Sequence, residues 1–358
     1  MKKQLILAGG GHGHIMIIKE LAKAGLEDYE ITLISDFKRQ YYSGMLPAYL
    51  EGIYSEEEIS FEILALCKSA GINFVLDKII EIDGEDKTVT CKNHTFTYDF
   101  ISMNLGSSPI RSMGNLPPNA IYAKPIAELV KASPRIADPK MKDIAIIGAG
   151  ASGVELALSL SASYPEKSFT LIGSKELIRH FNDKTRAKVL KVFEEREVKY
   201  IFDHVDKIDE NILYLTDKEL DYDFAIFAGG VTGPEISWKG FQVNEKNQVI
   251  VDSYLRASSS AIAMGDMIQL ADHPNVPMAG VFAIRQAPIL KHNLLTLCKS
   301  SCSCDTKSAL NCYCPQSKYL AILNIGNKKA ILNRGSWSWQ GHIPWLIKDW
   351  IDRAYMEK

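Results

Sequence analysis

A glycine-rich stretch in the middle of the chain, GAGASGVELALSL, has the residue types and spacing of a site for a dinucleotide pyrophosphate. Gly148, Gly150 and Gly153 fill the three glycine positions of the pattern G-x-G-x-x-G, with Ser152 beside the third. The first glycine of this pattern allows a tight turn, the second lets backbone approach the phosphates, and the third lets helix and strand pack closely. The positive end of the following helix then attracts the anion.

The N-terminal stretch LILAGGGHGHIMI repeats this arrangement with one departure. Gly9 and Gly11 fill the first two glycine positions, but His14 stands at the third. Two interpretations are open: helix and strand stand slightly further apart here, or the imidazole lines a nucleotide pocket. Because a helix N-terminus disfavours the imidazolium, the second interpretation predicts a neutral, hydrogen-bonding histidine.

Each glycine stretch needs a strand on either side of its helix, because parallel strands are joined by a right-handed crossover. The first β-α-β unit is predicted as strand 3–8, helix 15–23 and strand 30–34. The second begins with strand 143–147 and continues after its helix with strand 168–172.

Three other segments have interpretable patterns. Ser55 and Glu58 resemble a capping box, which predicts a helix over 56–68 ended by Gly71. The proline-containing segment 109–134 is predicted to connect two domains. Short strands are predicted at 73–75, 78–82, 88–91, 95–98 and 100–104.

The bulk composition limits the class of protein. The chain has 358 residues, enough for two domains. A net charge of −2 gives no reason to expect a nucleic-acid partner. No apolar run reaches the roughly 18 residues of a membrane span, and the apolar run after Lys3 stops at Gly9, too early for a signal peptide. We expect a cytoplasmic protein, either a homodimer or a monomer.

Five of the seven cysteines lie between residues 298 and 314. Cys302, Cys304, Cys312 and Cys314 form two C-x-C pairs, whose four thiolates could surround zinc or an iron–sulfur centre. A redox-active thiol pair is a second interpretation, and a segment without a specific role is the favoured one.

The C-terminal stretch HIPWLIKDWIDRAYM predicts an amphipathic helix. One face is predicted to carry Trp345, Ile347 or Leu346, Trp350, Ile351 and Tyr355. Packing of this face on the rest of the protein is favoured. Peripheral contact with the inner face of a membrane is the alternative.

Several stretches of the chain resemble one family. LILAGGGHGH resembles its glycine–histidine phosphate loop, and YYSGMLPAYLEGIY resembles a signature that lies near its flavin ring. YDFISMNLGSSP, YDFAIFAGGVTGPE, AMGDM, GVFAIRQAPIL, PQSKYLAIL and IKDWIDRAYM extend the resemblance over nearly the whole chain. The chain is similar to the FAD-dependent pyridine nucleotide-disulfide oxidoreductases, in particular to type II NADH dehydrogenases, and within them to flavoproteins associated with selenide, water dikinase.

The resemblance implies an α/β fold with two Rossmann-like dinucleotide-binding domains, one for FAD and one for NAD(P)H, and a small C-terminal domain. The implied boundaries are 1–110 and 246–296 for the FAD-binding domain, 111–245 for the NAD(P)H-binding domain, and 297–358 for the C-terminal domain with its cysteine-rich loop and aromatic helix.

The implied activity is that of an FAD-dependent NAD(P)H dehydrogenase, which passes a hydride from NAD(P)H to FAD and then electrons to a quinone or another small acceptor. The resemblance gives catalytic positions to Glu155, Tyr42 and Met45. It implies cofactor contacts for Gly9, Gly11, His12, His14, Asp36, Ser43, Gly44, Ile79, Leu105, Gly106, Gly148, Gly150, Ser152, Gly153, Lys175, Gly229, Gly230, Gly265, Asp266 and Phe282.

Two positions depart from the usual pattern, in which an acid at the end of the second strand holds the ribose. Ser35 stands there in the first unit, followed by Asp36. Gly173 stands there in the second, followed closely by Lys175. With no carboxylate to repel a 2′-phosphate, NADPH stays open beside NADH, unless Lys175 is simply a solvated surface charge.

Residues 36–60 contain no cysteine, so a disulfide reductase is not favoured and direct transfer from flavin to acceptor is. Two other functions stay open. One is a reductase serving selenium or sulfur metabolism, and the other is a redox-sensing flavoprotein without steady turnover.

Overall fold

The computed structural model describes residues 2–299 and 309–357. The chain forms two compact units, each made of three segments. Unit 1 comprises Met1–Gln40, Phe61–Ser108 and Val231–Gln316. Unit 2 comprises Tyr41–Ser60, Pro109–Gly230 and Ser317–Lys358. The chain crosses from one unit to the other at or beside the short strands β3 (Arg39–Tyr41), β4 (Ser60–Glu62), β10 (Ser108–Pro109) and β19 (Val231–Thr232), and again between Gln316 and Ser317.

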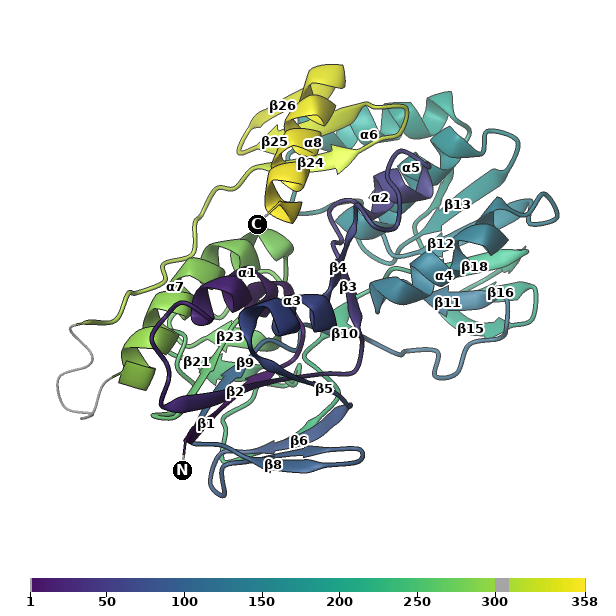
Figure 1. Cartoon of the computed structure of the whole chain (residues 1–358). Helices are drawn as coiled ribbons and strands as arrows, with labels where there is room; N and C mark the ends of the chain where they lie inside the picture. Colours follow the sequence, from purple (N-terminus) through teal and green to yellow (C-terminus); the bar gives the residue numbers. More distant parts are fainter. Residues whose placement is uncertain (1, 300–308, 358) are drawn as a thin grey trace. The chain divides into compact units, whose positions relative to one another are not determined.

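Unit 1 is built on a five-stranded parallel sheet with the order β22-β9-β1-β2-β5. The strands are β1 (Lys3–Ala8), β2 (Tyr29–Ser35), β5 (Asn73–Leu76), β9 (Phe100–Met103) and β22 (Ala261–Ala263). Helix α1 (His12–Leu21) contacts both α3 (Ile63–Ala70) and α7 (Gly280–Lys299) (Figure 1). Leu5 and Leu7 of β1 are fully buried, as expected for the central strand of a parallel sheet.

Two smaller sheets complete unit 1. One has the order β20-β6-β7-β8, and the other pairs β21 with β23, which directly follows the short helix η1 in the chain. Their bounds are β6 (Ile79–Asp83), β7 (Thr88–Cys91), β8 (Thr95–Thr97), β20 (Ser237–Lys239), β21 (Val249–Val251), η1 (Gly265–Met267) and β23 (Ile268–Leu270).

Unit 2 repeats the parallel plan with the order β11-β18-β12-β13-β14. Here the edge strand β11 precedes the others in the chain, whereas β22 of unit 1 comes last. The elements are β11 (Ala120–Tyr122), α4 (Ile126–Ala137), β12 (Asp143–Ile147), α5 (Ala151–Ser163), β13 (Ser168–Ile172), α6 (Asp183–Glu195), β14 (Lys199–Ile201) and β18 (Phe224–Phe227).

The rest of unit 2 is antiparallel or helical. Strands β15 (Val205–Asp209), β16 (Ile212–Leu215) and β17 (Glu219–Asp221) form one small sheet. Strands β24 (Ala321–Asn324), β25 (Ala330–Arg334) and β26 (Trp337–Gly341) form another, and α8 (His342–Met356) packs on it. The short helix α2 (Leu46–Leu50) packs on α5. The expected α/β class with two Rossmann-like sheets is confirmed.

Two predicted segments are wrong. The residues after Ser55 form a turn and then β4, and helix α3 begins only at Ile63. The capping-box hydrogen bonds are nevertheless present, from the Ser55 N–H to Glu58 Oε2 at 2.8 Å and from the Glu58 N–H to Ser55 Oγ at 3.3 Å, so they close a turn. Segment 109–134 is no plain connection, because it contributes β11 and most of α4, with Pro134 inside that helix.

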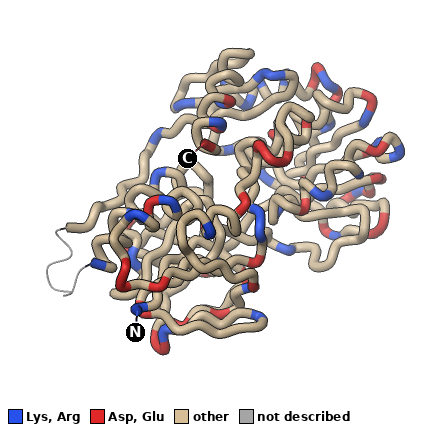
Figure 2. The backbone as a smooth tube through the Cα atoms, in the orientation of Figure 1, with Lys and Arg blue, Asp and Glu red and all other residues tan. Residues whose placement is uncertain are grey.

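Charged residues of both signs are interspersed along the backbone of each unit (Figure 2). This distribution agrees with the small net charge of −2.

Candidate functional site

The glycine loop of unit 2 has the backbone shape required for close approach of a phosphate. Gly148 has φ +132°, and a Cβ atom there would lie 2.5 Å from the carbonyl oxygen of Ala228. A Cβ atom on Gly153 would lie 1.9 Å from the carbonyl oxygen of Gly148. Both positions therefore demand glycine. At Gly150, the residue before α5, a Cβ atom would meet open space, so the loop leaves room for a ligand at the helix N-terminus.

The glycine loop of unit 1 has a similar backbone but closer surroundings, because a Cβ atom on Gly11 would lie 2.3 Å from Asn104 Oδ1, whereas one on Gly150 would meet open space. Gly9 has φ +96°, and a Cβ atom there would lie 2.5 Å from the carbonyl oxygen of Asn104, which follows β9. Gly11 precedes α1 as Gly150 precedes α5. Each unit thus presents one strand–glycine–helix loop suited to a dinucleotide.

His14 fastens helix α1 to the sheet of unit 1. Its Nδ1 lies 2.7 Å from the carbonyl oxygen of Gly9, and its Nε2 lies 2.8 Å from Ser102 Oγ. The side chain is completely buried, and burial lowers the pKa of His14 to about 4. The imidazole is neutral, donating from Nδ1 and accepting at Nε2. Protein atoms occupy both ring nitrogens, so His14 shapes the loop, and its contact with a nucleotide stays a prediction.

Asn104 organises the same loop and was not among the expected site residues. Its backbone oxygen accepts from the Gly11 N–H at 3.2 Å, and its Oδ1 accepts from the Gly13 N–H at 2.9 Å. Its Nδ2 donates to the Met264 carbonyl at 3.2 Å. A polar residue directly after the apolar run of β9 is the sequence signal that could have identified it.

Three of the expected FAD contacts line one pocket of unit 1. Gly265 and Asp266 in η1 and Phe282 in α7 meet there with Gln248 and Gln286. Gln286 is buried, and its Oε1 accepts from the Gly265 N–H at 2.7 Å, which fixes η1 against α7. Because its carboxylate only accepts hydrogen bonds, Asp266 suits the hydroxyls of a sugar or ribityl chain.

Other expected contacts of unit 1 lie on the strand ends. Leu105 directly follows Asn104, and its N–H lies 3.2 Å from Met267 Sδ. A Cβ atom on Gly106 would meet open space. Ile79 belongs to the core of the unit, with 4% of its surface exposed.

Ser35 stands at the end of β2, where an acid usually binds the ribose. Ser35 is buried, and its side chain lies against the backbone of Gly10. Asp36, one residue later, is exposed and available for a ribose, although desolvation by its neighbours raises the pKa of its carboxyl. His12 Nδ1 lies 3.3 Å from the Gln40 amide nitrogen.

The expected flavin-facing residues 42–45 belong to unit 2, where Tyr42 joins the C-terminal helix. Tyr42 donates to Asp352 Oδ1 at 3.1 Å and stacks on Tyr355, with 4.4 Å between ring centroids. Ser43 is exposed. The Met45 side chain is 1% exposed and packs in the core of unit 2. We assign Met45 to packing and do not carry its catalytic role forward.

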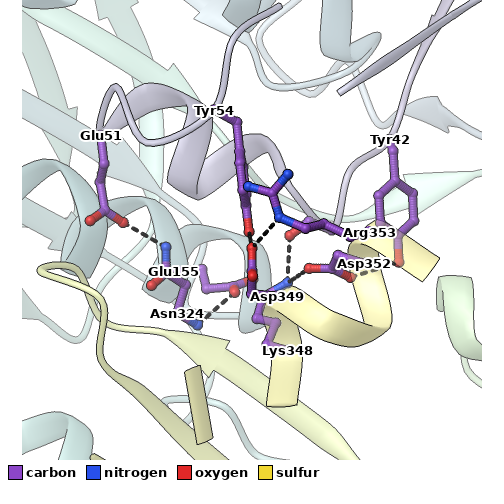
Figure 3. Close-up of polar contacts among 10 residues, drawn as sticks. Tyr42, Glu51, Tyr54, Glu155, Asn324, Lys348, Asp349, Asp352 and Arg353 are labelled. Atoms are coloured by element: carbon purple, nitrogen blue, oxygen red, sulfur yellow. Dashed lines mark hydrogen bonds and ion pairs between the residues drawn. The ribbon is translucent and has the colours of Figure 1, made fainter. Parts of the chain in front are cut away.

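Glu155 of α5 and Lys348 of α8 belong to a polar network inside unit 2 (Figure 3). Glu155 Oε1 accepts from the Asn324 N–H at 2.8 Å. Lys348 Nζ donates to the Gly44 carbonyl at 2.5 Å and pairs with Asp352 Oδ2 at 2.7 Å. The lysine side chain is 13% exposed and its aspartate partner 6%, so this ion pair is largely desolvated.

The network sets the protonation of its members. Burial raises the pKa of Glu155 to about 7, and the nearby Lys348 opposes this shift. For Lys348, burial alone would lower the pKa, but the carboxylates of Asp352 and Glu155 outweigh burial and leave the pKa raised. Lys348 therefore stays charged, while Glu155 can gain or lose a proton near neutral pH. The sequence signal missed here was a lysine and an aspartate four residues apart on one helix face.

Two further contacts frame this network (Figure 3). Glu51 accepts from Asn324 Nδ2 at 2.5 Å and from the Asn327 N–H at 3.0 Å, and burial raises its pKa. Tyr54 donates to Asp349, which also pairs with Arg353 at 3.0 Å.

The other expected nucleotide contacts of unit 2 lie at the carboxyl ends of the strands. Gly229 and Gly230 follow β18, and a Cβ atom on Gly229 would meet open space. Ser152 is exposed in the first turn of α5. Lys175 is exposed after β13, and its carbonyl accepts from the Tyr200 hydroxyl at 3.1 Å.

The predicted metal centre gains no support. Cys302 and Cys304 lie outside the described residues. Cys312 and Cys314 are exposed on either side of the buried Tyr313. Among residues 2–299 and 309–357, no group of three or more histidine, cysteine, aspartate or glutamate side chains is placed to hold a metal ion.

The aromatic residues of helix α8 lie on two faces, not on the single face that the sequence predicted. Trp345 and Tyr355 are buried together with Asp352, whereas Leu346 and Trp350 are exposed, at 46% and 71%. The predicted single face is therefore wrong, because Lys348 and Asp352 occupy the inner face. Within the described part of the chain, no helix combines the length and apolar character needed to cross a bilayer.

Comparisons with known proteins place this geometry in a family. The model of the pyridine nucleotide-disulphide oxidoreductase family matches residues 3–287. The type II NADH:quinone oxidoreductase of Staphylococcus aureus is 20% identical over 329 residues, covering 82% of each chain.

Two solved structures share the fold. The sulfide:quinone oxidoreductase of Aquifex aeolicus has a TM-score of 0.80 and 20% identity, covering 99% of this chain and 91% of its own. NDH2 from Plasmodium falciparum, solved in complex with NADH, has a TM-score of 0.79 and 16% identity, covering 100% and 97%. The chain belongs to the pyridine nucleotide-disulphide oxidoreductase family and is an NADH dehydrogenase-like enzyme.

Proposed function

We propose that the protein is an FAD-dependent NAD(P)H oxidoreductase that passes electrons to a quinone or a similar small acceptor. The observation that carries this proposal is the presence of one dinucleotide loop of similar backbone shape in each unit, around Gly9 in unit 1 and Gly148 in unit 2. Two dinucleotides are what a flavoprotein that oxidises NAD(P)H must bind.

In unit 1, different residues bind the pyrophosphate, the ribityl chain and the adenosine ribose of FAD. Gly9 and Gly11 hold the pyrophosphate at the N-terminus of α1. Asp266 accepts hydrogen bonds from ribityl hydroxyls, and Asp36 from the adenosine ribose. A bound flavin would accept a hydride and pass electrons on, while the chain supplies binding, orientation and electrostatics.

Unit 2 supplies the pyridine nucleotide site and a proton-holding group. Gly148, Gly150 and Ser152 hold the second pyrophosphate at the N-terminus of α5. Reduction of a quinone to a quinol by a hydride consumes one additional proton. Glu155 suits this step because its pKa of about 7 lets it hold a proton at neutral pH and release it to an acceptor.

Direct transfer from flavin to the acceptor agrees with the state of the buried thiols. Burial raises the pKa of Cys67 to about 11 and that of Cys91 to about 12. Thiols in this state are poor nucleophiles, because the thiolate is the reactive form. Neither residue suits the covalent thiol chemistry of a disulfide reductase.

The exposed apolar residues of α8 support peripheral contact with a membrane, where a lipid quinone would be found. Leu346 and Trp350 lie one turn apart on the solvent face. Sedimentation with vesicles of phosphatidylethanolamine and phosphatidylglycerol tests this. The Trp350→Glu variant should lose at least half of its vesicle binding, and Leu190→Glu, at an exposed apolar site on α6, should keep it. Absence of binding by the parent protein would reject the membrane contact alone.

An anaerobic titration tests the oxidoreductase itself. The purified protein should be yellow, its visible absorbance should bleach on addition of NADH or NADPH, and a water-soluble quinone should restore the colour. Bound FAD that is bleached by neither nucleotide would reject the proposal and favour a sensing role.

A further inference from the structure

The segment after β13 differs from an NADH site at the position that decides the choice between nucleotides. An acid at the end of this strand normally binds both ribose hydroxyls and repels a 2′-phosphate. Here the position is Gly173, and a Cβ atom on it would lie 2.3 Å from Ala149 Cβ and 3.0 Å from Ala149 N. The packing of the glycine loop itself therefore leaves no room for a carboxylate at this position.

Two cations stand in the following loop. Lys175 and Arg179 are both exposed. Between them, Leu177 and Ile178 are each 2% exposed, and the Ile178 N–H donates to the Ala149 carbonyl at 2.8 Å. The cations are thus carried by a segment that is anchored directly to the phosphate loop.

The single acid of this segment is already neutralised. Glu176 pairs with Arg186 Nη1 at 2.9 Å, and the same guanidinium donates from Nε to the Leu177 carbonyl at 3.0 Å. Arg186 is 17% exposed, so this pair is held close to the protein. Lys175 and Arg179 consequently give the segment an excess of positive charge.

Phe202 places an exposed aromatic ring beside the end of β13. It follows β14, the strand that pairs with β13 in the register Ile172↔Ile201, and its side chain is 69% exposed. Tyr200 of the same strand donates to the Lys175 carbonyl. An exposed aromatic ring beside the strand end that normally meets the adenosine ribose offers a stacking surface for a purine.

We propose that the preferred pyridine nucleotide is NADPH, with Lys175 and Arg179 binding the 2′-phosphate and Phe202 stacking on the adenine. This inference rests on the proposed function and names the substrate of its second dinucleotide site. A 2′-phosphate is dianionic, and only an adenosine that carries it can use both cations.

A binding measurement without turnover is the first test. Calorimetry with 2′,5′-ADP and with 5′-AMP on the FAD-loaded protein should show at least tenfold tighter binding of 2′,5′-ADP. Lys175→Ala and Arg179→Ala should each weaken 2′,5′-ADP by about fivefold or more and leave 5′-AMP within twofold. Lys191→Ala, an exposed lysine on α6 that pairs with Glu195, is the matched control and should change neither ligand. Equal affinity for the two nucleotides in the parent protein would overturn the proposal.

The rate of flavin bleaching tests the NADPH preference separately from the oxidoreductase activity. NADPH should bleach the flavin at a second-order rate at least tenfold above that of NADH, and the Lys175→Ala/Arg179→Ala double variant should lose this preference. Faster bleaching by NADH would overturn the NADPH assignment while supporting the oxidoreductase. Bleaching by neither nucleotide would instead reject the oxidoreductase itself.

Discussion

The imidazole of His14 donates from Nδ1 to the carbonyl oxygen of Gly9 at 2.7 Å, and this contact takes the place of a missing glycine. In unit 2, Gly153 must lack a side chain because its Cβ atom would strike the corresponding carbonyl oxygen, that of Gly148. In unit 2 the glycine leaves space for the Gly148 carbonyl, whereas in unit 1 the histidine donates a hydrogen bond to the Gly9 carbonyl. Both solutions let a helix follow a strand through a tight glycine turn, so the departure from G-x-G-x-x-G preserves the shape of the loop.

Restoring the glycine should therefore harm unit 1. His14→Gly removes a fully buried side chain and leaves Ser102 and the Gly9 carbonyl without their partner. We expect a loss of about 3 kcal/mol in the free energy of unfolding, together with weaker FAD binding. His14→Asn, whose amide can still donate to the Gly9 carbonyl, should lose less. Chemical denaturation and flavin release measure both effects. A glycine variant as stable as the parent would show that the imidazole is only a spacer.

His14 should also make stability depend on pH. Its pKa is about 4 in the folded protein and 6.5 in an unfolded chain, so the unfolded state binds more protons between these values. The free energy of unfolding should consequently fall as the pH decreases from about 6.5 to about 4, by up to about 3 kcal/mol. Denaturation curves of the parent and of His14→Asn isolate this contribution as a difference. An identical slope for both proteins would contradict the assignment of a buried neutral imidazole.

Local pattern was sufficient for the two phosphate loops but not for the side chains around them. Gly9 and Gly148 are defined by their own segments, since apolar strand, glycine turn and helix follow one another in the chain. The partners of the loops come from elsewhere. Asn104 reaches the first loop from the end of β9, and although its place after an apolar run marks it as a candidate, the sequence does not indicate which groups it binds.

Helix α8 shows a second limit. Its aromatic residues suggested one apolar face, but Lys348 and Asp352 lie on the inner face because distant groups compensate their charges. A hydropathy pattern predicts that a lysine is exposed. It carries no information on the Gly44 carbonyl, 304 residues earlier in the chain, which accepts a hydrogen bond from Lys348. The capping box at Ser55 failed for a related reason, since its two hydrogen bonds close a turn as readily as they begin a helix.

The ion pair between Lys348 and Asp352 should be costly to break. Lys348→Met leaves a buried carboxylate without its counter-ion, and a loss of about 3–5 kcal/mol in the free energy of unfolding is expected. The double variant Lys348→Met/Asp352→Leu should regain part of this loss. Arg353 lies on the same helix and forms exposed ion pairs with Glu58 and Asp349, and Arg353→Ala should cost about 1 kcal/mol or less. Equal losses for Lys348→Met and Arg353→Ala would show that the inner pair is solvated.

The cysteines should react in two classes. Cys312 and Cys314 are exposed, whereas Cys67, Cys91 and Cys298 are buried with pKa values raised to about 11, 12 and 12. A thiol reagent should modify the first two in the native protein, and the Cys312→Ser/Cys314→Ser variant should lose two fast-reacting equivalents. The three buried thiols should react only on unfolding. If both exposed thiols react slowly and a chelator restores fast reaction, a bound metal would explain the protection and the metal site would be supported.

Glu155 should control how electron release from the enzyme depends on pH. Because burial raises its pKa to about 7, the carboxyl is protonated below this pH and charged above it. If it supplies the proton that accompanies quinone reduction, the rate of flavin reoxidation by quinone should fall as the pH rises through about 7. In Glu155→Gln the rate should be about tenfold to a hundredfold lower at pH 6 and nearly independent of pH between 6 and 8.

The same substitution provides its own structural control. A glutamine keeps the shape and can still accept from the Asn324 N–H, so nucleotide binding should change by less than twofold. Relative to the parent, the folding stability of the variant should rise as the pH increases from about 4.5 to about 7, because the parent's carboxyl ionises more readily in the unfolded chain than in its buried site. A variant that retains the parent's pH profile of reoxidation would remove Glu155 from the proton path, and one that loses nucleotide affinity would assign it to binding instead.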